Sequence, residues 1–421
     1  MPRSLAEWLA HLESLHPKTI ALGLERVAQV KQRLKLDPDF PIVIVGGTNG
    51  KGSVCALLEA ILHAAGYRVG CYTSPHLLHY NERVRVGKRQ ASDAELCASF
   101  EQIEQVRGDI PLTYFEFGTL AAMQCFIAHQ VDVAILEVGL GGRLDAVNVF
   151  DASVSVVTSV DIDHVDYLGE TREQIAFEKA GIFRHGHVAI CADSDVPQAL
   201  RAHANEIGAE LWCIGSEFGF TAHQGQWDYR SKVGWRSALP IPALRGAFQL
   251  HNASAALAAL DALKDQTPVS MEAVRRGLNE VELTGRFQFV PGKPQLILDV
   301  AHNPHAARSL AQNLANLPPA KTFAVFAMLK DKDMAGVVQA LDAQIDIWLV
   351  AGITAPRGAT ATELAQVLEA SGVRGRVAIC DSIAAALHEA ERQAGENDRI
   401  AAFGSFYTVA AVMQARGRHQ A

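Results

Sequence analysis

The stretch Phe40–Ala65 (FPIVIVGGTNGKGSVCALLEAILHAA) decides the fold of this protein. It opens with a continuous apolar run, which is typical of a buried parallel strand, and Ser53–Ala65 is typical of a helix. The glycines between them allow backbone N–H groups to approach phosphate oxygens, and a helix N-terminus favours negative charge. In this setting Lys51 can reach the β- and γ-phosphates, and Ser53 is placed like a metal-ligating hydroxyl. The stretch therefore predicts a nucleotide-binding strand–loop–helix unit.

The loop departs from the strict phosphate-binding pattern, in which a serine or threonine follows the lysine directly. Here Gly52 separates Lys51 from Ser53. A tight turn that merely exposes its lysine is the alternative interpretation. Glycines flanking a lysine between a strand and a helix favour nucleotide binding over that alternative.

The alternation of strand and helix continues outward from this unit. Further strands are predicted at 68–72, 131–138, 153–160, 187–192 and 211–214, and helices at 93–106, 117–129, 172–182 and 197–207. Strands that alternate with helices imply a doubly wound, mostly parallel sheet. Residues 216–245 break the pattern with glycines and aromatic residues, which predicts small antiparallel hairpins, and helices are expected at 251–264 and 271–279.

A second, smaller α/β domain is predicted after Val290–Pro294 (VPGKP), a segment whose prolines and glycine are typical of a linker. Its strands are expected at 295–300, 322–327, 346–350, 376–380 and 399–403. The sequence thus predicts a P-loop-type nucleotide-binding domain with a mostly parallel sheet over residues 1–290. A Rossmann-like C-terminal α/β domain is predicted over residues 295–421.

The composition is typical of a soluble cytoplasmic enzyme. The 421 residues carry 38 basic and 46 acidic side chains, and the resulting net charge of −8 argues against a general surface for nucleic acid or anionic membranes. No apolar run in the sequence approaches the roughly 20 residues that cross a bilayer. The seven cysteines include no C-x-x-C pair, which is typical of reduced thiols.

Acidic residues follow two predicted strands, at the positions where parallel sheets bind ligands. Glu137 lies in the apolar run 131–138, and Gly139, Gly141 and Gly142 are expected to leave room for the backbone to approach a ligand. The alternative is that Glu137 pairs with Arg143 and shapes the loop. The titratable residues of Asp161–Asp166 would repel one another unless cations share them, and a solvated loop is the alternative.

Lys179 is predicted to lie on the apolar face of a helix. Thr171 and Gln174 match a capping box, so a helix is expected to begin near Arg172. Spacings of four and three then put Lys179 on one face with Ile175 and Ile182. A lysine that snorkels to solvent is the ordinary explanation of this pattern.

The loop GGTNGKGS resembles the nucleotide loop of the Mur ligase superfamily, and its G-K-G form is similar to that of folylpolyglutamate synthase/dihydrofolate synthase enzymes. Other segments agree with this resemblance in the family order. They are 73–77 (TSPHL), 112–116 (LTYFE), 137–145 (EVGLGGRLD), 163–164 (DH), 178–182 (EKAGI) and 298–304 (LDVAHNP). These motifs span most of both predicted domains.

The resemblance implies an ATP-dependent amide ligase that adds L-glutamate to dihydropteroate and to reduced folate polyglutamates through an acyl phosphate. It implies ATP contacts at Thr48, Asn49, Gly50, Lys51, Gly52, Ser53, Asn252, Arg286, Asp299 and His302. It implies ligands for two magnesium ions at Ser74, Glu137, His164 and a carbamylated Lys179. It implies dihydropteroate or folate contacts at Leu22, Gly23, Thr113, Phe115, Leu144 and Asp145.

The same resemblance implies catalytic roles for Lys51, His164 and Lys179. Imidazole is a less usual ligand for magnesium than carboxylate or hydroxyl, so His164 has the weakest chemical case as a metal ligand. For Asp299 and His302, a helix N-cap cluster before Pro304 is the alternative.

Other functions stay open at this point. One is a synthase that only lengthens folate chains, and another is a Mur-type ligase of a UDP-linked peptidoglycan precursor. The latter is disfavoured because only 45 residues precede Gly46, too few for a UDP-binding domain. A nucleotide-dependent switch protein is a third alternative, and the resemblance implies a monomer that binds neither nucleic acid nor membranes.

Overall fold

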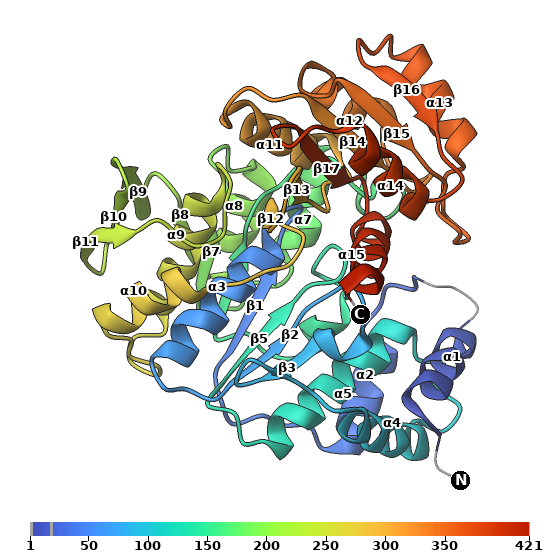
Figure 1. The fold of residues 1–421 in the computed structure, drawn as a ribbon. Coiled ribbons are helices and arrows are strands. Elements are labelled where there is room, and N and C mark those ends of the chain that lie inside the picture. Colours follow the sequence, from blue (N-terminus) through green and yellow to red (C-terminus); the bar gives the residue numbers. More distant parts are fainter. Residues whose placement is uncertain (1–2, 17–19, 421) are drawn as a thin grey trace. The chain divides into compact units, whose positions relative to one another are not determined.

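The computed structural model describes residues 3–16 and 20–420, which form two compact units (Figure 1). Unit 1 comprises Met1–Ala243 and Leu250–Val281, and unit 2 comprises Leu244–Gln249 and Glu282–Ala421. The expected linker at 290–294 is a turn inside unit 2, because the strands on either side of it pair with each other. The domain boundary predicted at that turn therefore moves to residues 281–282.

Unit 1 is built on an eight-stranded sheet with the order β4-β3-β2-β5-β1-β6-β7-β8. Its strands are β1 (Ile42–Gly46), β2 (Val69–Tyr72), β3 (Val84–Val86), β4 (Arg89–Gln90), β5 (Val133–Glu137), β6 (Val154–Val157), β7 (Val188–Cys191) and β8 (Glu210–Cys213). Strand β3 pairs antiparallel with both β2 and β4 at one edge, and the other pairs of this sheet are parallel, so the predicted mostly parallel sheet is confirmed. These two short strands were not predicted.

The helices of unit 1 are α1 (Leu5–Leu15), α2 (Glu25–Leu34), α3 (Lys51–Ala64), α4 (Asp93–Arg107), α5 (Tyr114–Ala128), α6 (Val165–Leu168), α7 (Arg172–Ala180), α8 (Gln198–Ile207), α9 (Gln249–Ala262) and α10 (Met271–Glu280). Helices α1, α4, α5, α7 and α10 each begin after a residue whose side chain caps the helix. The capping box predicted from Thr171 and Gln174 is present at α7, and Thr113 and Glu116 form another at α5. Helix α3 packs on β1, β2 and β5 and is buried along most of its length.

The register of the sheet brings chemically important positions together. Val45 of β1 pairs with Glu137 of β5, and Tyr72 of β2 pairs with Leu136. On the other side, Gly46 pairs with Val157 of β6. Because the carboxyl ends of neighbouring parallel strands meet at one edge, the loops that follow β2, β5, β1 and β6 lie side by side.

A three-stranded antiparallel sheet in unit 1 confirms the hairpins predicted for 216–245. It has the order β11-β10-β9, with β9 (Phe218–Ala222), β10 (Gln226–Ser231) and β11 (Trp235–Pro240). Buried Asp261 of α9 accepts hydrogen bonds from Tyr229 Oη at 3.0 Å and Ser231 Oγ at 2.6 Å, and it pairs with Arg236. One carboxylate therefore joins this sheet to the helix beneath it.

Replacing Asp261 with alanine is expected to destabilise unit 1 by about 3 kcal/mol, because it leaves a largely buried arginine without its partner. The midpoint of thermal unfolding, followed by tryptophan fluorescence, measures the loss. Asp265→Ala, at an exposed position just beyond the same helix, is the control. Equal midpoints for the two variants would contradict this role of Asp261.

Unit 2 contains a six-stranded sheet with the order β12-β13-β17-β14-β15-β16. Its elements are β12 (Gln288–Val290), β13 (Gln295–Leu298), β14 (Thr322–Phe326), β15 (Ile347–Val350), β16 (Arg376–Ile379), β17 (Arg399–Phe403), α11 (Pro304–Ala315), α12 (Met334–Leu341), α13 (Ala361–Ala370), α14 (Ile383–Gln393) and α15 (Phe406–Gln420). All pairs are parallel except β12 with β13. The rings of Phe326, Trp348 and Phe403 pack together in its core. The predicted second α/β domain is confirmed.

Candidate active site

The turn between β1 and α3 has the geometry of a phosphate-binding loop. Gly47 and Gly50 have φ values of 142° and 89°, a left-handed region that glycine adopts readily. Lys51 begins α3, and its Nζ donates to the carbonyl oxygens of Gly47 at 2.9 Å and Thr48 at 3.2 Å. The lysine side chain thus folds back over the loop, and the helix N-terminus lies beside it.

Polar residues at the end of β6 hold this loop in place. Thr48 N donates to the carbonyl of Ser159 at 2.8 Å, and Asn49 N donates to Ser159 Oγ at 3.0 Å. Thr158 Oγ1 donates to the carbonyl of Asn49 at 2.6 Å. Sequence reasoning missed Thr158 and Ser159, although two hydroxyl residues at the end of the apolar run 153–160 were a usable signal.

The predicted ATP residue Asn252 contacts the same loop from α9. A Cβ at Gly50 would lie 2.6 Å from Asn252 Oδ1, and a Cβ at Gly47 would lie 1.9 Å from Thr158 Oγ1. The loop backbone therefore has protein on both sides. The predicted residues Gly52 and Ser53 lie in the first turn of α3, where Ser53 is buried.

Gly50→Ala is expected to weaken ADP binding by about tenfold or more, because the new methyl group must displace Asn252 and shift the loop. Gly66→Ala is a matched control, since Gly66 also has a positive φ (95°) but a Cβ there would meet nothing within 4 Å. Both variants carry about 1 kcal/mol of backbone strain, so they should unfold at similar temperatures. Isothermal titration with ADP distinguishes them, and equal affinities would contradict the role of the close approach at Gly50.

Glu137 and Ser74 form an oxygen-rich corner beside the loop. Glu137 is the last residue of β5 and is 4% exposed, and its Oε2 accepts the Ser74 N–H at 3.0 Å. Glu137 also influences Cys55 in the core. Burial raises the pKa of the Cys55 thiol, and the negative charge of Glu137 adds to that rise. Carboxylate and hydroxyl oxygens are ligands that suit a hard dication such as Mg²⁺, so the chemistry of these two side chains fits a metal ion.

Lys179 lies buried on α7 with Ile175 on its face, as predicted. Burial, and secondarily the charge of Lys51, lowers the pKa of Lys179 from 10.5 to about 7, while Asp163 partly opposes this. The snorkelling alternative is therefore wrong, because only 3% of Lys179 is exposed. The three residues lie close enough to influence one another's charge.

His164 sits in the loop after β6 with a left-handed backbone (φ 54°) at the start of α6. Its backbone N–H donates to Asp163 Oδ1 at 2.8 Å, and its Nε2 lies 4.0 Å from Asp163 Oδ2. Asp163 is mostly buried, so the alternative of a simply solvated loop does not describe this pair. A carboxylate and an imidazole side by side are groups that can bind a cation.

The alternative pairing of Glu137 with Arg143 is not what shapes the 139–145 loop. Arg143 instead pairs with Glu178 of α7, with 2.8 Å between Nη2 and Oε1. The glycines of this loop also admit close protein neighbours. A Cβ at Gly139 would lie 2.7 Å from Phe115 Cζ, and one at Gly142 would lie 2.8 Å from the Glu178 carbonyl, so protein neighbours occupy that space.

The residues predicted to bind the pteridine come together from three separate segments. Gly23 N donates to the Leu144 carbonyl at 3.3 Å, which joins the segment before α2 to the loop after β5. The Phe115 ring packs 5.7 Å from the Tyr72 ring and against Gly139. Thr113, the N-cap of α5, and Leu22 lie on the flanking segments.

An ion pair that sequence reasoning missed holds two of these segments together. Arg26 donates to both carboxylate oxygens of buried Glu116 on α5, and also to the carbonyl of Ala21 at 2.7 Å. Glu116 in turn accepts the backbone N–H of Thr113. This network fixes Leu22 and Gly23 relative to the start of α5.

Asp145 lies buried at the centre of the same loop. Its carboxylate accepts the backbone N–H groups of Leu140 at 2.8 Å and Val147 at 3.1 Å. Burial nevertheless raises the pKa of Asp145 to about 7, although the backbone hydrogen bonds and, less strongly, the charge of Lys51 lower it. Asp145 is therefore close to the phosphate-binding loop and can exist with or without its proton near neutral pH.

The remaining predicted nucleotide residues gather in unit 2. Asp299 accepts the backbone N–H groups of Phe287 and Ala301, each at 2.8 Å, and burial raises the pKa of Asp299 against the opposing charge of Arg286. The Arg286 guanidinium lies 5.2 Å from the centre of the Phe406 ring, and the His302 ring lies 6.3 Å from it. The N-cap of α11 is Asn303, so the capping alternative applies to neither Asp299 nor His302.

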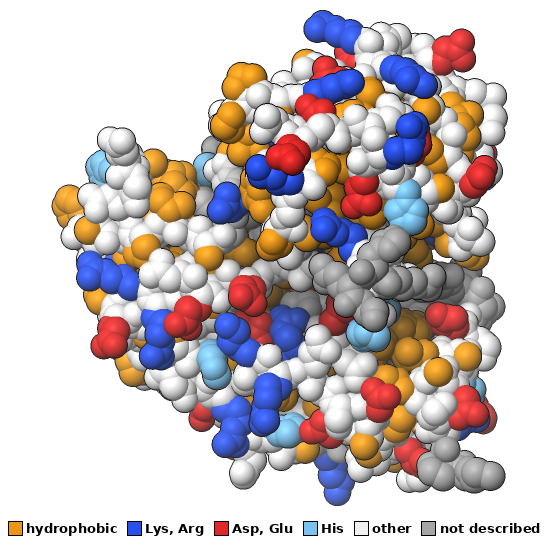
Figure 2. Space-filling view, in the orientation of Figure 1, with side chains coloured by type: hydrophobic (Ala, Val, Ile, Leu, Met, Phe, Trp, Pro, Cys, Tyr) orange, Lys and Arg blue, Asp and Glu red, His pale blue; other side chains and the backbone are white. Residues whose placement is uncertain are grey.

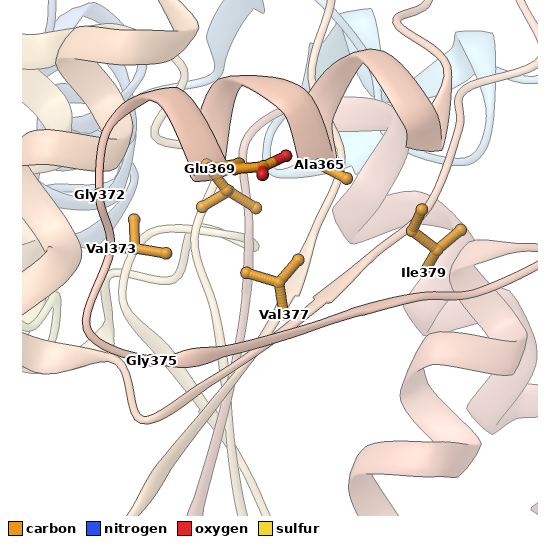
Figure 3. A pocket seen from close by; sticks show the side chains of 8 residues that line it. Ala365, Glu369, Gly372, Val373, Gly375, Val377 and Ile379 are labelled. Carbon is orange, nitrogen blue, oxygen red and sulfur yellow. The ribbon is translucent and has the colours of Figure 1, made fainter.

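A cavity in unit 2 is separate from the residues predicted to bind ligands. This shallow cavity of about 450 Å³ lies under α13, lined by apolar side chains such as Val377 and Ile379, with Glu369 at its rim (Figure 3). It contains none of the predicted residues. Basic and acidic side chains are interspersed on the face drawn in Figure 2. Within residues 3–16 and 20–420, no helix is both long and apolar enough to span a bilayer.

Family models and relatives agree with the geometry. The Mur ligase middle domain matches residues 45–260, and the Mur ligase glutamate ligase domain matches residues 285–406. The dihydrofolate synthase/folylpolyglutamate synthase of Escherichia coli (strain K12) is 47% identical over 412 residues, which are 97% of this chain and 95% of that protein.

Solved structures extend the likeness to the fold. E. coli FolC in complex with DHPP and ADP has a TM-score of 0.94 at 45% identity, covering 100% of this chain and 99% of that one. A bifunctional folylpolyglutamate synthase/dihydrofolate synthase with Mn, AMPPNP and L-glutamate bound has a TM-score of 0.91 at 47% identity, covering 99% and 98%. The chain therefore belongs to the dihydrofolate synthase/folylpolyglutamate synthase family of Mur ligases.

Proposed function

We propose that this protein is an ATP- and Mg²⁺-dependent ligase that joins L-glutamate by an amide bond to dihydropteroate and to reduced folates. The observation that carries the proposal is the convergence of the phosphate-binding loop, the Glu137–Ser74 corner, buried Lys179 and the Asp145 loop at one edge of a parallel sheet. The ligands named for relatives support it, since they include ADP, Mn, L-glutamate and DHPP.

Nucleotide binding follows from the loop. Backbone N–H groups at the start of α3 face the phosphates, and the Lys51 ammonium exchanges its bonds to Gly47 and Thr48 for phosphate oxygens. Asn252 supports the loop from α9, and Arg286, Asp299 and His302 are the proposed contacts from unit 2. Ser74, Glu137 and His164 would hold magnesium, which supplies charge neutralisation at the transferring phosphate.

The reaction uses the γ-phosphate of ATP to activate a carboxylate. A carboxylate oxygen of the acceptor attacks the γ-phosphorus, and ADP leaves with the electrons of the broken P–O bond. The amine of L-glutamate then attacks the acyl carbon, loses a proton, and displaces inorganic phosphate. Lys51 stabilises the charge that develops on the transferring phosphoryl group, and positioning of the substrates contributes the rest.

The pteridine is proposed to bind among Leu22, Gly23, Thr113, Phe115, Leu144 and Asp145. The half-buried Phe115 ring offers a face to a flat heterocycle. With a pKa of about 7, Asp145 can accept or donate a hydrogen bond to the polar edge of that ring system. The Arg26–Glu116 pair keeps the two sides of this pocket at a constant separation.

Lys179 is proposed to carry a carbamate, as in the family. The uncharged amine attacks CO₂, and loss of one proton leaves an anion in place of a cation. A buried anion near Lys51 and Asp163 would complete the ligands of a second magnesium ion. In ¹³C NMR, protein equilibrated with ¹³C-bicarbonate is expected to show a carbamate signal that Lys179→Met lacks.

An assay of inorganic phosphate release tests the proposed function. ATP, Mg²⁺ and L-glutamate are supplied with dihydropteroate, tetrahydrofolate, a UDP-linked peptidoglycan precursor, or no acceptor. We expect phosphate release with dihydropteroate and, separately, with tetrahydrofolate, but not without an acceptor. Mass spectrometry should show the added glutamate. Release with tetrahydrofolate alone would indicate a synthase that only lengthens folate chains. Release without an acceptor, or with the UDP compound alone, would overturn the proposal.

A further inference from the structure

Arg85 is a largely buried cation that the proposed chemistry does not use. It lies on the antiparallel edge strand β3, with 19% of its side chain exposed. Its Nε and Nη2 donate to the carboxylate of Glu59 on α3 at 2.8–3.1 Å, and that carboxylate side chain is 7% exposed. The pair therefore links the edge strand to the helix that follows the phosphate-binding loop.

The remaining donor of Arg85 faces the proposed metal corner. Its Nη1 donates to Thr73 Oγ1 at 3.1 Å and to the carbonyl of Glu82 at 2.8 Å. Thr73 N donates to the carbonyl of Arg83 at 2.9 Å. Thr73 is thus held by both its side chain and its backbone, and the next residue is Ser74.

Ser74 is where this network meets Glu137. The Ser74 N–H donates to Glu137 Oε2 at 3.0 Å, which orients that carboxylate. A shift of Thr73 would move both the Ser74 hydroxyl and the hydrogen bond that aims Glu137. Arg85 is therefore linked to the proposed metal ligand Ser74 through Thr73, and to Glu137 through Ser74 in turn.

Stability alone does not account for such a pair. Removing two charges from water costs several kcal/mol per ion, and buried ion pairs are often replaceable by apolar residues without loss of stability. Outer partners of metal ligands, in contrast, commonly change metal affinity by about tenfold to a hundredfold when they are removed. The geometry of Arg85 matches such a partner.

We propose that Arg85 is a positioning residue for the metal site, acting through Thr73 on Ser74 and Glu137; this rests on the metal role proposed for those two residues. The competing explanation is that Arg85 only neutralises Glu59. The two explanations differ in what happens when both charges are removed together. If neutralisation is the whole role, the apolar pair restores the site, whereas a positioning role is lost with the guanidinium.

The experiment compares Arg85→Met, the double variant Arg85→Met/Glu59→Met, and Thr73→Val, which removes only the hydroxyl that Arg85 contacts. Arg89→Met, on the exposed strand next to β3, is the matched control. Mn²⁺ binding in the presence of AMPPNP is measured by electron paramagnetic resonance. Thermal unfolding and the Mg²⁺ dependence of phosphate release are recorded for each protein.

We expect the double variant and Thr73→Val to unfold within a few degrees of the unaltered protein, yet to bind Mn²⁺ about tenfold to a hundredfold more weakly. Excess Mg²⁺ should recover much of kcat, so the KM for Mg²⁺ rises more than kcat falls. Arg89→Met should behave like the unaltered protein. If Arg85→Met alone fails to fold because Glu59 is left unpaired, the double variant still allows Mn²⁺ binding to be measured.

The outcomes separate this inference from the proposed function. Normal Mn²⁺ affinity in the double variant, together with weakened binding in Ser74→Ala, would overturn the role of Arg85 alone. An unaltered affinity in Ser74→Ala, or no Mn²⁺ binding by the unaltered protein, would overturn both the metal role of Ser74 and the inference built on it. Weak binding by Thr73→Val and the double variant, with normal unfolding, supports the inference.

Discussion

Lys51→Met is expected to slow acceptor-dependent phosphate release by about a thousandfold, because a pre-positioned donor to the transferring phosphoryl group is lost. The lysine bends back over the loop onto the carbonyl oxygens of Gly47 and Thr48, so its ammonium is already held near the phosphate position. Methionine keeps the length and apolar stem of the side chain but lacks the charge. Steady-state kinetics with dihydropteroate and with tetrahydrofolate measure the loss.

The control for this prediction is Lys31→Met. Lys31 also donates its Nζ to a backbone carbonyl, that of Val149 at 3.2 Å, and this Nζ lies 5.1 Å from the centre of the Phe150 ring. It lies on α2, away from the phosphate-binding loop in sequence. Both variants should remain folded, and only Lys51→Met should lose turnover. Retention of more than a tenth of the rate by Lys51→Met would refute the assigned role.

Lys179→Met is expected to combine a loss of activity with a gain in stability. Losing a ligand of the proposed second metal ion should reduce turnover by about a hundredfold. In metal-free protein prepared without bicarbonate, however, the same change should raise the free energy of unfolding. It removes a buried amine whose pKa is lowered to about 7, because burial disfavours its charged form. Gain of stability and loss of function in one variant would identify a residue kept for chemistry.

The stability effect has a defined pH dependence. Between about pH 7 and 10.5 the unfolded chain holds the Lys179 proton and the folded protein does not, so stability of the unaltered protein rises with pH through this window. The cost relative to methionine should be about 4 kcal/mol at pH 7 and about 2 kcal/mol at pH 9. Thermal unfolding across this range tests it, with exposed Lys264→Met as the control. An advantage that does not shrink as pH rises would show that the lysine is not buried as a neutral amine.

The linker at 290–294 shows why one organisational prediction failed. Prolines and glycine are equally typical of a linker and of a tight hairpin turn. A hairpin turn reverses the chain direction, a linker lacks regular backbone hydrogen bonds, and both favour these residues. Only the pairing of Phe289 with Ile297 makes this segment a turn. That pairing depends on neighbours in the sheet, since β13 is held on its other side by β17.

The candidate site divides in the same way. Motifs contiguous in sequence, such as 46–53 and 137–145, could be recognised because backbone conformation and residue type act locally. Pairs such as Arg26–Glu116 and Arg85–Glu59 could not, because their partners lie 90 and 26 residues apart and nothing local marks them as neighbours. The close neighbours of the glycines at 139 and 142 could not be predicted for the same reason, since they come from α5 and α7.

The sequence by itself determined the alternation of strands and helices, the phosphate-binding loop and the place of Lys179 on the apolar face of a helix, because each depends on periodicity or on residues adjacent in the chain. Only the tertiary structure decided which strand lies beside β1, and therefore that Glu137 and Ser74 share a corner next to the loop. It also decided that Arg143 pairs with Glu178 rather than Glu137. Strand order and side-chain pairing depend on how segments far apart in the chain pack together in the sheet. Residues adjacent in the sequence therefore do not reveal them.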